Sequence, residues 1–390
     1  MAIPGADALM ADAEARTGLR DWGWFDIKSP LEALTGSLNA EARLTERGER
    51  ACHERLSFVL ANRLRMIEDR RRWPQIAAEE VRRPVIIPGL PRSGTTMLLQ
   101  ILAQDPANRS PLTWEILAPS PPPQSATFAT DPRIAEVQSM LDRHGFTRPE
   151  LMAMHAFDAE LADECIFILE HAMTFTPYGA FWDTPSYGAW CARADDRGPY
   201  KVHKEVLQQL QFRAPAERWV LKAPNHMQHL PALVETYPDA VFIQTHRDLG
   251  RIIPSLAKLF GALRRTFTDD PAKADIVQAA RGQLSAWTEG LNDMTQFRKD
   301  PAMDARFVDL NYKTTLADPI GAVEKVYSKF DLPLSAEAKS RMERWLAENR
   351  QGRHGAHEYS LAECGLTERD IDEHFGEYME RYGVTREERI

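Results

Sequence analysis

The chain has 390 residues, enough to bury a substantial interior as one large domain or as a core with a smaller cap. Its formal net charge of −9 argues against general affinity for nucleic acids or anionic membranes, so any anion site has to be built locally. The four cysteines form no CxxC pair, which excludes a disulfide framework and a cysteine zinc site and is typical of a reducing compartment.

The start of the chain lacks the basic segment and apolar stretch of a signal peptide. No apolar run approaches the roughly 20 residues that a membrane helix needs. We therefore expect a cytoplasmic protein that inserts into no membrane. The oligomeric state, including a homo-oligomer, is left open.

The first 80 residues have a helical pattern. Apolar residues recur three and four positions apart at Leu56, Val59, Leu60, Leu64 and Ile67. This spacing predicts an N-terminal helical layer over residues 1–80.

Residues 84–105 read PVIIPGLPRSGTTMLLQILAQD, which predicts a strand, a phosphate-binding loop and a helix. The segment follows the nucleotide-binding pattern G-x-x-x-x-G-K-[ST] at Gly89, Gly94 and Thr96, but Thr95 replaces the lysine. That lysine is the cation that reaches the outer phosphates of ATP or GTP. With Arg92 as its only fixed positive charge, the loop suits one phosphate group better than a triphosphate with magnesium.

Residues 110–115 are interpreted as a short second strand that ends near Glu115. Ligands gather at the carboxyl ends of strands in open α/β sheets, so Glu115 is a candidate site residue. Residues 131–214 are mainly helical and form a predicted cap. An aromatic-rich piece in this cap can line an apolar acceptor pocket or act as a lid; its members are Phe175, Tyr178, Phe181, Trp182, Tyr187 and Trp190.

Further strands are predicted at 219–222, 239–245 and 306–310, separated by helical segments. Strands that alternate with helices favour a mainly parallel sheet, here of about five strands flanked by helices. Lys222 and Arg247 both follow strand ends, where a ligand is expected.

We interpret the whole chain as one α/β domain. It comprises the helical layer 1–80, a P-loop core of 81–130 and 215–335, the cap 131–214, and a C-terminal loop with helices at 336–390. Within the cap, His155, Glu160, Asp163 and Glu164 have helical spacings, but a single histidine without a second cluster does not favour a metal site.

Two segments together resemble the sulfotransferases that use 3′-phosphoadenosine 5′-phosphosulfate (PAPS). They are PGLPRSGTT and FIQTHRDLGRIIPSL, the second with Arg247 and Ser255 eight residues apart. The chain resembles the bacterial branch with a P-R-S-G-T-T loop, which is related to cytosolic and protein-tyrosine sulfotransferases. The resemblance covers roughly residues 81–333.

The resemblance implies a binding site for the donor. The 5′-phosphosulfate would be held by the loop residues Arg92, Ser93, Gly94, Thr95 and Thr96. Arg247 and Ser255 would bind the 3′-phosphate, and Tyr312 would flank the adenine. Arg353, in a basic loop with glycines, would lie over the 3′-phosphate.

The resemblance also implies in-line transfer of a sulfuryl group without a metal. Lys222 and Arg92 would stabilise the transferring group and the leaving phosphate by charge. The general base differs between branches of the family. Glu115 matches the protein-tyrosine branch and is favoured; His226 lies nearest the histidine of the cytosolic branch; His155 and His203 are further alternatives.

The expected reaction is transfer of sulfate from PAPS to a hydroxyl or amine of a small, apolar or phenolic acceptor. Two other functions stay open from the sequence. One is a P-loop kinase that acts on a small molecule with Mg²⁺ and ATP, and the other is a nucleotide-binding scaffold without catalysis.

Overall fold

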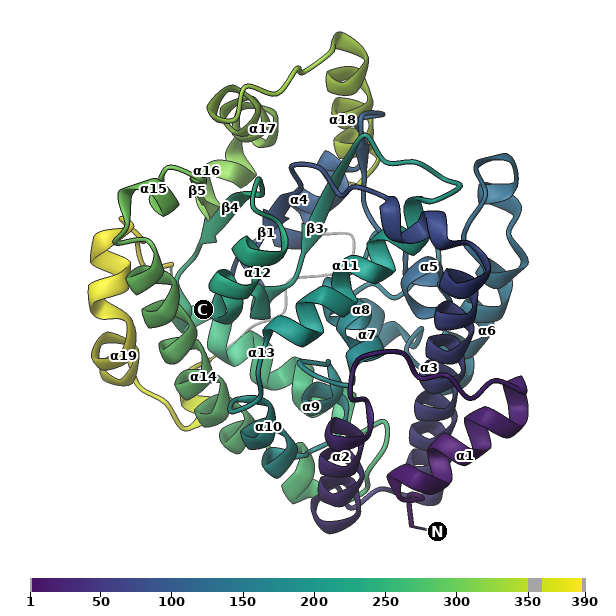
Figure 1. Ribbon diagram of the computed structural model, residues 1–390. Helices are drawn as coiled ribbons and strands as arrows, with labels where there is room; N and C mark the ends of the chain where they lie inside the picture. Colours follow the sequence, from purple (N-terminus) through teal and green to yellow (C-terminus); the bar gives the residue numbers. More distant parts are fainter. Residues whose placement is uncertain (1, 350–359, 388–390) are drawn as a thin grey trace. The chain divides into compact units, whose positions relative to one another are not determined.

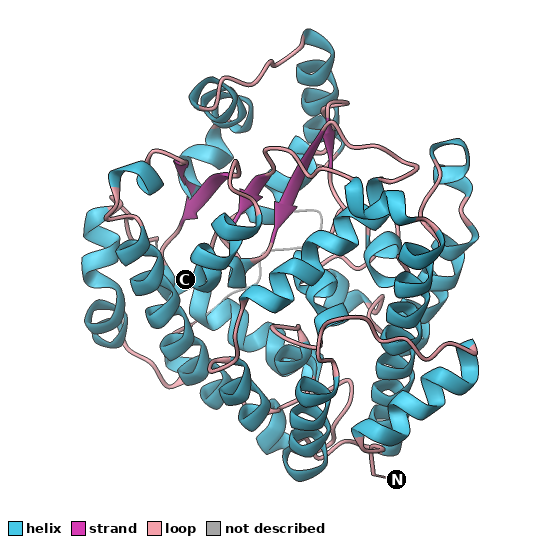
Figure 2. Ribbon diagram, viewed as in Figure 1, coloured by secondary structure: helices cyan, strands magenta, loops and turns pink. Residues whose placement is uncertain are grey.

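A computed structural model describes residues 2–349 and 360–387 of the chain. Its sheet has five strands in the order β2-β3-β1-β4-β5, and every pair of neighbours is parallel. Figure 1 labels β3, β1, β4 and β5, and Figure 2 draws the strands in magenta. The strands are β1 (Val85–Ile87), β2 (Asn108–Arg109), β3 (Arg218–Lys222), β4 (Val241–His246) and β5 (Phe307–Asn311). The predicted α/β fold with a parallel sheet of about five strands is confirmed.

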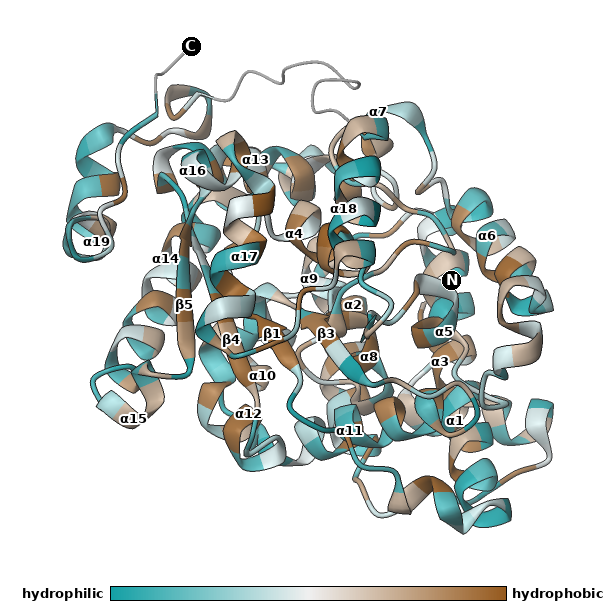
Figure 3. Cartoon of the chain, turned by 90° about the horizontal axis from the view of Figure 1, so that it is seen from above, coloured by the Kyte–Doolittle hydropathy of each residue, from teal (hydrophilic) through white to brown (hydrophobic). Residues whose placement is uncertain are grey.

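The middle of the sheet is apolar and buried. Ile86 of β1 pairs with Leu221 of β3 on one side and with Phe242 of β4 on the other. All three side chains are fully buried, as expected for parallel strands covered on both faces. Figure 3 shows the same strands as hydrophobic stretches.

The chain divides into two compact units. One unit is made of Met1–Val81, Pro111–Ala216 and Gly261–Ala274, and the other of Arg82–Ser110, Glu217–Phe260 and Asp275–Ile390. We call them the helical unit and the sheet unit, because all five strands belong to the second. The division of the chain into core, cap and C-terminal segments stays a prediction.

The helical unit is built around α3 (Glu46–Arg72), against which α1 (Ala6–Thr17) packs. Thr45 caps the start of α3 by accepting a hydrogen bond from the Gly48 N–H at 3.0 Å. Three arginines occupy its last turn, where positive charge is favourable. The other helices of this unit are α2 (Lys28–Glu41), α5 (Thr113–Leu117), α6 (Pro132–His144), α7 (Pro149–Met152), α8 (Cys165–Ile168), α9 (Tyr178–Phe181), α10 (Pro185–Cys191) and α11 (Arg197–Gln211).

The helices of the sheet unit follow or connect its strands. They are α4 (Thr95–Leu102), α12 (Leu230–Thr236), α14 (Ile276–Phe297), α15 (Pro301–Asp304), α16 (Tyr312–Ala317), α17 (Pro319–Lys329), α18 (Ala336–Glu348) and α19 (Glu368–Arg381), while α13 (Leu249–Arg264) begins in this unit. None of the helices in the described residues has both the length and the apolar character that crossing a membrane requires.

The strand predicted at 110–115 is wrong. The second strand lies earlier, at Asn108–Arg109, and helix α5 starts at Thr113. Backbone bonds follow the helical pattern, with the Ile116 N–H donating to the Leu112 carbonyl at 3.1 Å. All five residues of α5 are buried, so the helix lacks the polar face that gives a helical periodicity.

Candidate functional site

The loop between β1 and α4 is held against the neighbouring strand β4. A side chain at Gly89 would place its Cβ 2.1 Å from the Thr245 Oγ1, so only glycine fits there without a shift. The Ser93 hydroxyl lies 2.6 Å from the same Thr245 oxygen. Gly94 precedes α4 with φ of 87°, in the left-handed region that favours glycine. The loop therefore leads directly into the positive end of a helix, an arrangement suited to an anion.

The structure brings two predicted donor-binding residues into direct contact. Arg92 donates a hydrogen bond from Nε to the Ser255 Oγ at 2.9 Å. Ser255 lies on α13 and is buried. The phosphate loop and the helix after β4 therefore meet through a guanidinium and a hydroxyl, both of which can donate to phosphate oxygens.

Arg247, which directly follows β4, joins the same cluster. Its Nη1 donates to the Arg92 carbonyl oxygen at 2.6 Å. Its guanidinium carbon lies 3.9 Å from the centre of the Tyr312 ring, close enough for a cation–π contact. Arg92, Ser255, Arg247 and Tyr312 thus form one contiguous group in the sheet unit, which we call the arginine cluster.

The side-chain carboxylate of Glu387 also binds Arg247. The Arg247 Nε and Nη2 donate to the two Glu387 carboxylate oxygens at 2.7 and 2.9 Å. The Glu387 backbone N–H donates in turn to Asp248 at 2.7 Å. Burial lowers the pKa of Arg247, but the Glu387 carboxylate outweighs burial and the net change is upward. Glu387 was not predicted from the sequence, because 140 residues separate it from Arg247.

Lys222 is the last residue of β3, and its side chain is almost fully buried. Its Nζ lies 3.5 Å from the Thr96 Oγ1, at the first turn of α4. A cation from the neighbouring strand therefore reaches the phosphate loop, which lacks a lysine of its own.

His246, the residue before Arg247, is buried and is the centre of a hydrogen-bond network that was not predicted from the sequence either. Its ring nitrogens contact the Tyr378 hydroxyl at 2.6 Å and the Asp309 carboxylate at 2.7 Å. Arg298 donates to both Asp309 oxygens at 2.7 and 2.8 Å. Burial lowers the pKa of His246 despite the nearby Asp309. This network holds the last residue of β4 in place and thereby positions the backbone of the next residue, Arg247.

The candidate bases lie in different surroundings. Glu115 belongs to α5 in the helical unit, is fully buried, and accepts a hydrogen bond from the Leu112 N–H at 3.1 Å. His226 lies in a short 3-10 helix (Pro224–His229) after β3 in the sheet unit and is also buried. His203 is buried on α11, and burial lowers its pKa to about 3. His155 is partly exposed after α7, and Arg353 lies outside the described residues.

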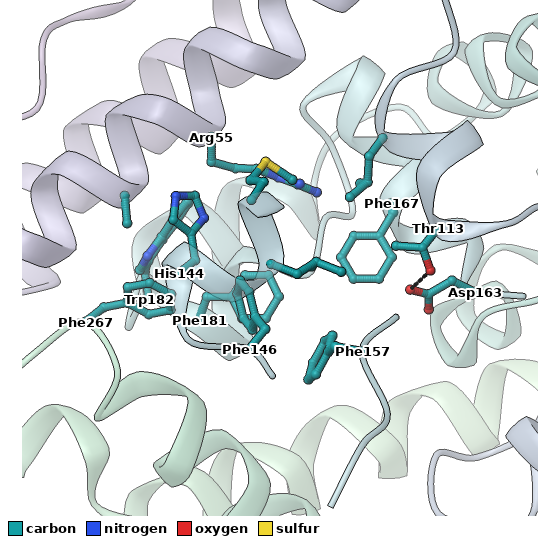
Figure 4. A pocket seen from close by; sticks show the side chains of 14 residues that line it. Arg55, Thr113, His144, Phe146, Phe157, Asp163, Phe167, Phe181, Trp182 and Phe267 are labelled. Carbon is teal, nitrogen blue, oxygen red and sulfur yellow. Dashed lines mark hydrogen bonds between the residues drawn. The ribbon is translucent and has the colours of Figure 1, made fainter. Parts of the chain in front are cut away.

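The helical unit contains a pocket of about 500 Å³, including the solvent at its opening. Figure 4 shows the aromatic side chains that line it together with a few polar ones. Two residues of the aromatic segment singled out in the sequence, Phe181 and Trp182, are among them.

Comparison with known proteins decides the family. A model of the "Sulfotransferase family" matches residues 84–336, more than half of the chain. The chain belongs to this family. The matched range begins just before β1 and extends past β5, so it contains the loop, Lys222 and the arginine cluster. The predicted family is confirmed.

Mycobacterial sulfotransferases are similar in sequence and structure. "Omega-hydroxy-beta-dihydromenaquinone-9 sulfotransferase Stf3" of Mycobacterium bovis is 25% identical over 315 residues, covering 78% of this chain and 76% of the relative. The crystal structure of sulfotransferase STF9 from Mycobacterium avium has a TM-score of 0.90 and 29% identity, covering 99% of this chain and 98% of the other. That of STF1 from Mycobacterium tuberculosis has a TM-score of 0.82 and 30% identity, covering 96% and 99%.

Proposed function

We propose that this sulfotransferase takes its sulfuryl group from PAPS and transfers it to a hydroxyl of a small apolar or phenolic acceptor. The observation that carries the proposal is the arginine cluster beside the phosphate loop. A donor with phosphate at both its 5′ and 3′ positions needs two anion sites, and the loop and the arginine cluster together would provide both. The loop and Lys222 would bind the 5′-phosphosulfate, while Arg247 and Ser255 would bind the 3′-phosphate.

The proposed step forms a bond between the acceptor oxygen and sulfur. The bond between sulfur and the bridging phosphate oxygen breaks, and the hydroxyl proton passes to a base. The products are a sulfate ester and adenosine 3′,5′-bisphosphate. Lys222 and Arg92 would stabilise the negative charge that develops on the sulfuryl and phosphate oxygens, and Tyr312 would pack against the adenine.

Glu115 is the proposed base, with His226 as the second candidate. Glu115 is fully buried, and its carboxylate is of the type that can accept a hydroxyl proton as a general base. The short helix α5 fixes the Glu115 backbone, and the bond from Leu112 holds one of its oxygens.

ATP with Mg²⁺ is a poorer fit as donor. Thr95 occupies the position at which P-loop kinases place a lysine on the outer phosphates. Apolar character of the acceptor is supported by the aromatic pocket of the helical unit. It is also consistent with the menaquinone-derived acceptor in the name of the mycobacterial relative.

The test is a product assay without added metal. The purified protein is incubated with PAPS and a panel of apolar alcohols, phenols and amines in the presence of a chelator. We expect equimolar sulfate ester and adenosine 3′,5′-bisphosphate from at least one acceptor. Phosphate transfer from Mg-ATP to the same panel, without sulfate transfer, would contradict the proposal.

A further inference from the structure

Glu115 lies in a helix that is too short to be stable by itself. α5 has five residues, whereas an isolated helix needs roughly 12 or more to be stable in water. The N–H groups of a first helical turn and the carbonyl oxygens of a last turn have no partners inside the helix, so α5 depends on partners outside it. All five residues are buried, so water at the surface cannot supply these partners.

The start of α5 is bound by a neighbouring segment of the backbone. The Thr113 N–H donates to the Leu161 carbonyl oxygen at 2.9 Å, and the Thr113 hydroxyl donates to the same oxygen at 3.1 Å. The Trp114 N–H donates to the Ala159 carbonyl oxygen at 3.0 Å. The acceptors at this end are all backbone carbonyls, which a side-chain substitution does not remove.

The end of α5 is bound by side chains instead. His171 Nε2 lies 2.8 Å from the Ile116 carbonyl oxygen. Asn62 Nδ2 donates to the Leu117 carbonyl oxygen at 3.1 Å. Because a carbonyl oxygen can only accept, the proton of the His171 ring must be on Nε2. Burial lowers the pKa of His171 to about 4, so the ring stays neutral at pH 7.

A third side chain binds the next carbonyl. Arg133 Nη1 donates to the Ala118 carbonyl oxygen at 2.7 Å, while its Nε and Nη2 donate to the Asp131 carboxylate. Three successive carbonyl oxygens after Glu115 are therefore bound by three buried side chains, each from a different element. We call these side chains the carbonyl clamp: Asn62 of α3, Arg133 of α6 and His171 of the 3-10 helix Leu169–Ala172.

We propose that the carbonyl clamp positions Glu115 for proton removal from the acceptor, and that its three members are positioning residues of the reaction. The inference rests on the proposed function, with Glu115 as its base. Each bond of the carbonyl clamp restrains the backbone just after Glu115. A general base works only within hydrogen-bond reach of the proton that it takes, and a misplacement of about 1 Å can lower a rate about a hundredfold.

His171 offers a pair of variants that differ in one donor. His171→Leu removes the donor to the Ile116 carbonyl, whereas His171→Gln keeps a nitrogen that can donate to it. The acceptor is the member of the panel of apolar alcohols, phenols and amines that gives the highest turnover with the unmodified protein. We expect kcat to fall at least about tenfold in His171→Leu and to stay within about threefold in His171→Gln. The KM for PAPS should stay within about twofold in both, because the arginine cluster belongs to the sheet unit.

A double variant separates positioning from a general loss of structure. If the carbonyl clamp acts through Glu115, His171→Leu should lower turnover no further once Glu115→Gln has removed the base. Asn62→Leu, which removes the donor to the next carbonyl, should behave in the same way and replaces His171→Leu if that variant does not fold. Ser57→Ala is the matched control. It removes a bond at 3.2 Å between Asp12 and another buried side chain of α3, and should lower the urea midpoint while turnover stays unchanged.

The outcomes distinguish this inference from the function on which it rests. Unchanged kcat in His171→Leu and Asn62→Leu, with turnover lost in Glu115→Gln, would overturn the carbonyl clamp and leave the proposed function intact. An equal loss from His171→Leu with and without Glu115→Gln would also overturn it, because the effect would then not pass through the base. Normal turnover in Glu115→Gln would overturn the carbonyl clamp together with the base assignment, but not sulfate transfer. Absence of sulfate transfer and of bisphosphate binding in the unmodified protein would overturn both proposals.

Discussion

The guanidinium N–H groups of Arg247 donate hydrogen bonds to a backbone carbonyl oxygen of the phosphate loop and to the side-chain carboxylate of Glu387. The Arg92 carbonyl oxygen accepts a hydrogen bond from Nη1, and the Glu387 carboxylate accepts hydrogen bonds from Nε and Nη2. A 3′-phosphate that binds Arg247 must therefore compete with Glu387 for the same guanidinium. Glu387 compensates the charge of the half-buried Arg247, and we expect this ion pair to weaken the binding of a 3′-phosphate.

We expect Glu387→Gln to tighten binding of adenosine 3′,5′-bisphosphate by about three- to tenfold, because a neutral amide competes less well with phosphate. Isothermal titration calorimetry measures the change. Glu377→Gln, which removes the same charge from the exposed face of α19, is the matched control and should bind like the unmodified protein. Weaker binding in Glu387→Gln would show that the carboxylate instead holds Arg247 in its binding position.

Glu115 combines two roles that a single substitution can separate. Its carboxylate caps the backbone of Leu112 and is the proposed base. Gln keeps an oxygen for the cap but cannot take up the proton, so Glu115→Gln should keep bisphosphate affinity and thermal stability while turnover falls about 10²- to 10⁴-fold. Steady-state kinetics with saturating PAPS test this. Turnover near the unmodified rate would assign the base to His226.

Residues in motifs were predictable from the sequence, whereas their partners were not. Arg92 stands in the phosphate-loop pattern, and the family resemblance implies phosphate contacts for Arg247 and Ser255; the structure brings the three residues together. Glu387 and the partners of His246 come from segments far away in the chain, and nothing in their own surroundings marks them. Only the three-dimensional fold brings them to β4.

At the scale of elements, the sequence predicts the ends of the strands with continuous apolar runs to within about two residues. β3 and β4 are such runs, buried along their whole length and bounded by turns. The short element after β2 was misassigned because five buried residues have no periodicity that separates a strand from a helix. The first two N–H groups of α5 donate to the carbonyl oxygens of residues 161 and 159, and no local sequence pattern reveals these partners.

The phosphate loop depends on close packing against β4, which gives a direct test. Gly89→Ala would drive a Cβ to 2.1 Å from the Thr245 Oγ1 and 2.8 Å from the Thr95 Cγ2. We expect this variant to lose at least about 2 kcal/mol of unfolding free energy and most of its bisphosphate affinity, since the loop must shift. Urea unfolding and calorimetry measure both quantities.

Gly282→Ala is the control for that substitution. Gly282 lies within α14, and a Cβ added there would meet no other atom within 4 Å, so alanine should stabilise the helix by up to about 1 kcal/mol. Equal stability of the two variants would mean that the loop does not pack against β4 as described.

At the scale of the molecule, buried histidines make stability depend on pH. Burial lowers the pKa of His171 from 6.5 to about 4, and that of His203 to about 3. Below pH 6.5 the unfolded chain takes up protons that the folded chain does not, so the free energy of unfolding falls as the pH falls. Glu170, whose pKa burial raises to about 7, opposes this trend above pH 4.5.

We therefore expect a shallow loss of stability from pH 6.5 to 4.5, where two histidines outweigh one carboxylate, and a steeper loss below pH 4.5. His171 alone lowers the free energy of unfolding by roughly 3 kcal/mol between pH 6.5 and pH 4. The measurement is the urea midpoint between pH 7.5 and 4. His171→Gln, which keeps a donor for the Ile116 carbonyl, should flatten the dependence. A midpoint that rises toward pH 4 would contradict the neutral, buried state of these histidines.

The central claim, that the loop and the arginine cluster together bind a nucleotide with a 3′-phosphate, is tested most directly by ligand-induced stabilisation. Adenosine 3′,5′-bisphosphate at about 100 times its dissociation constant should raise the free energy of unfolding by roughly 2.7 kcal/mol. Mg-ATP, which lacks the 3′-phosphate, should raise it much less at the same concentration. Equal or greater stabilisation by Mg-ATP would contradict the account.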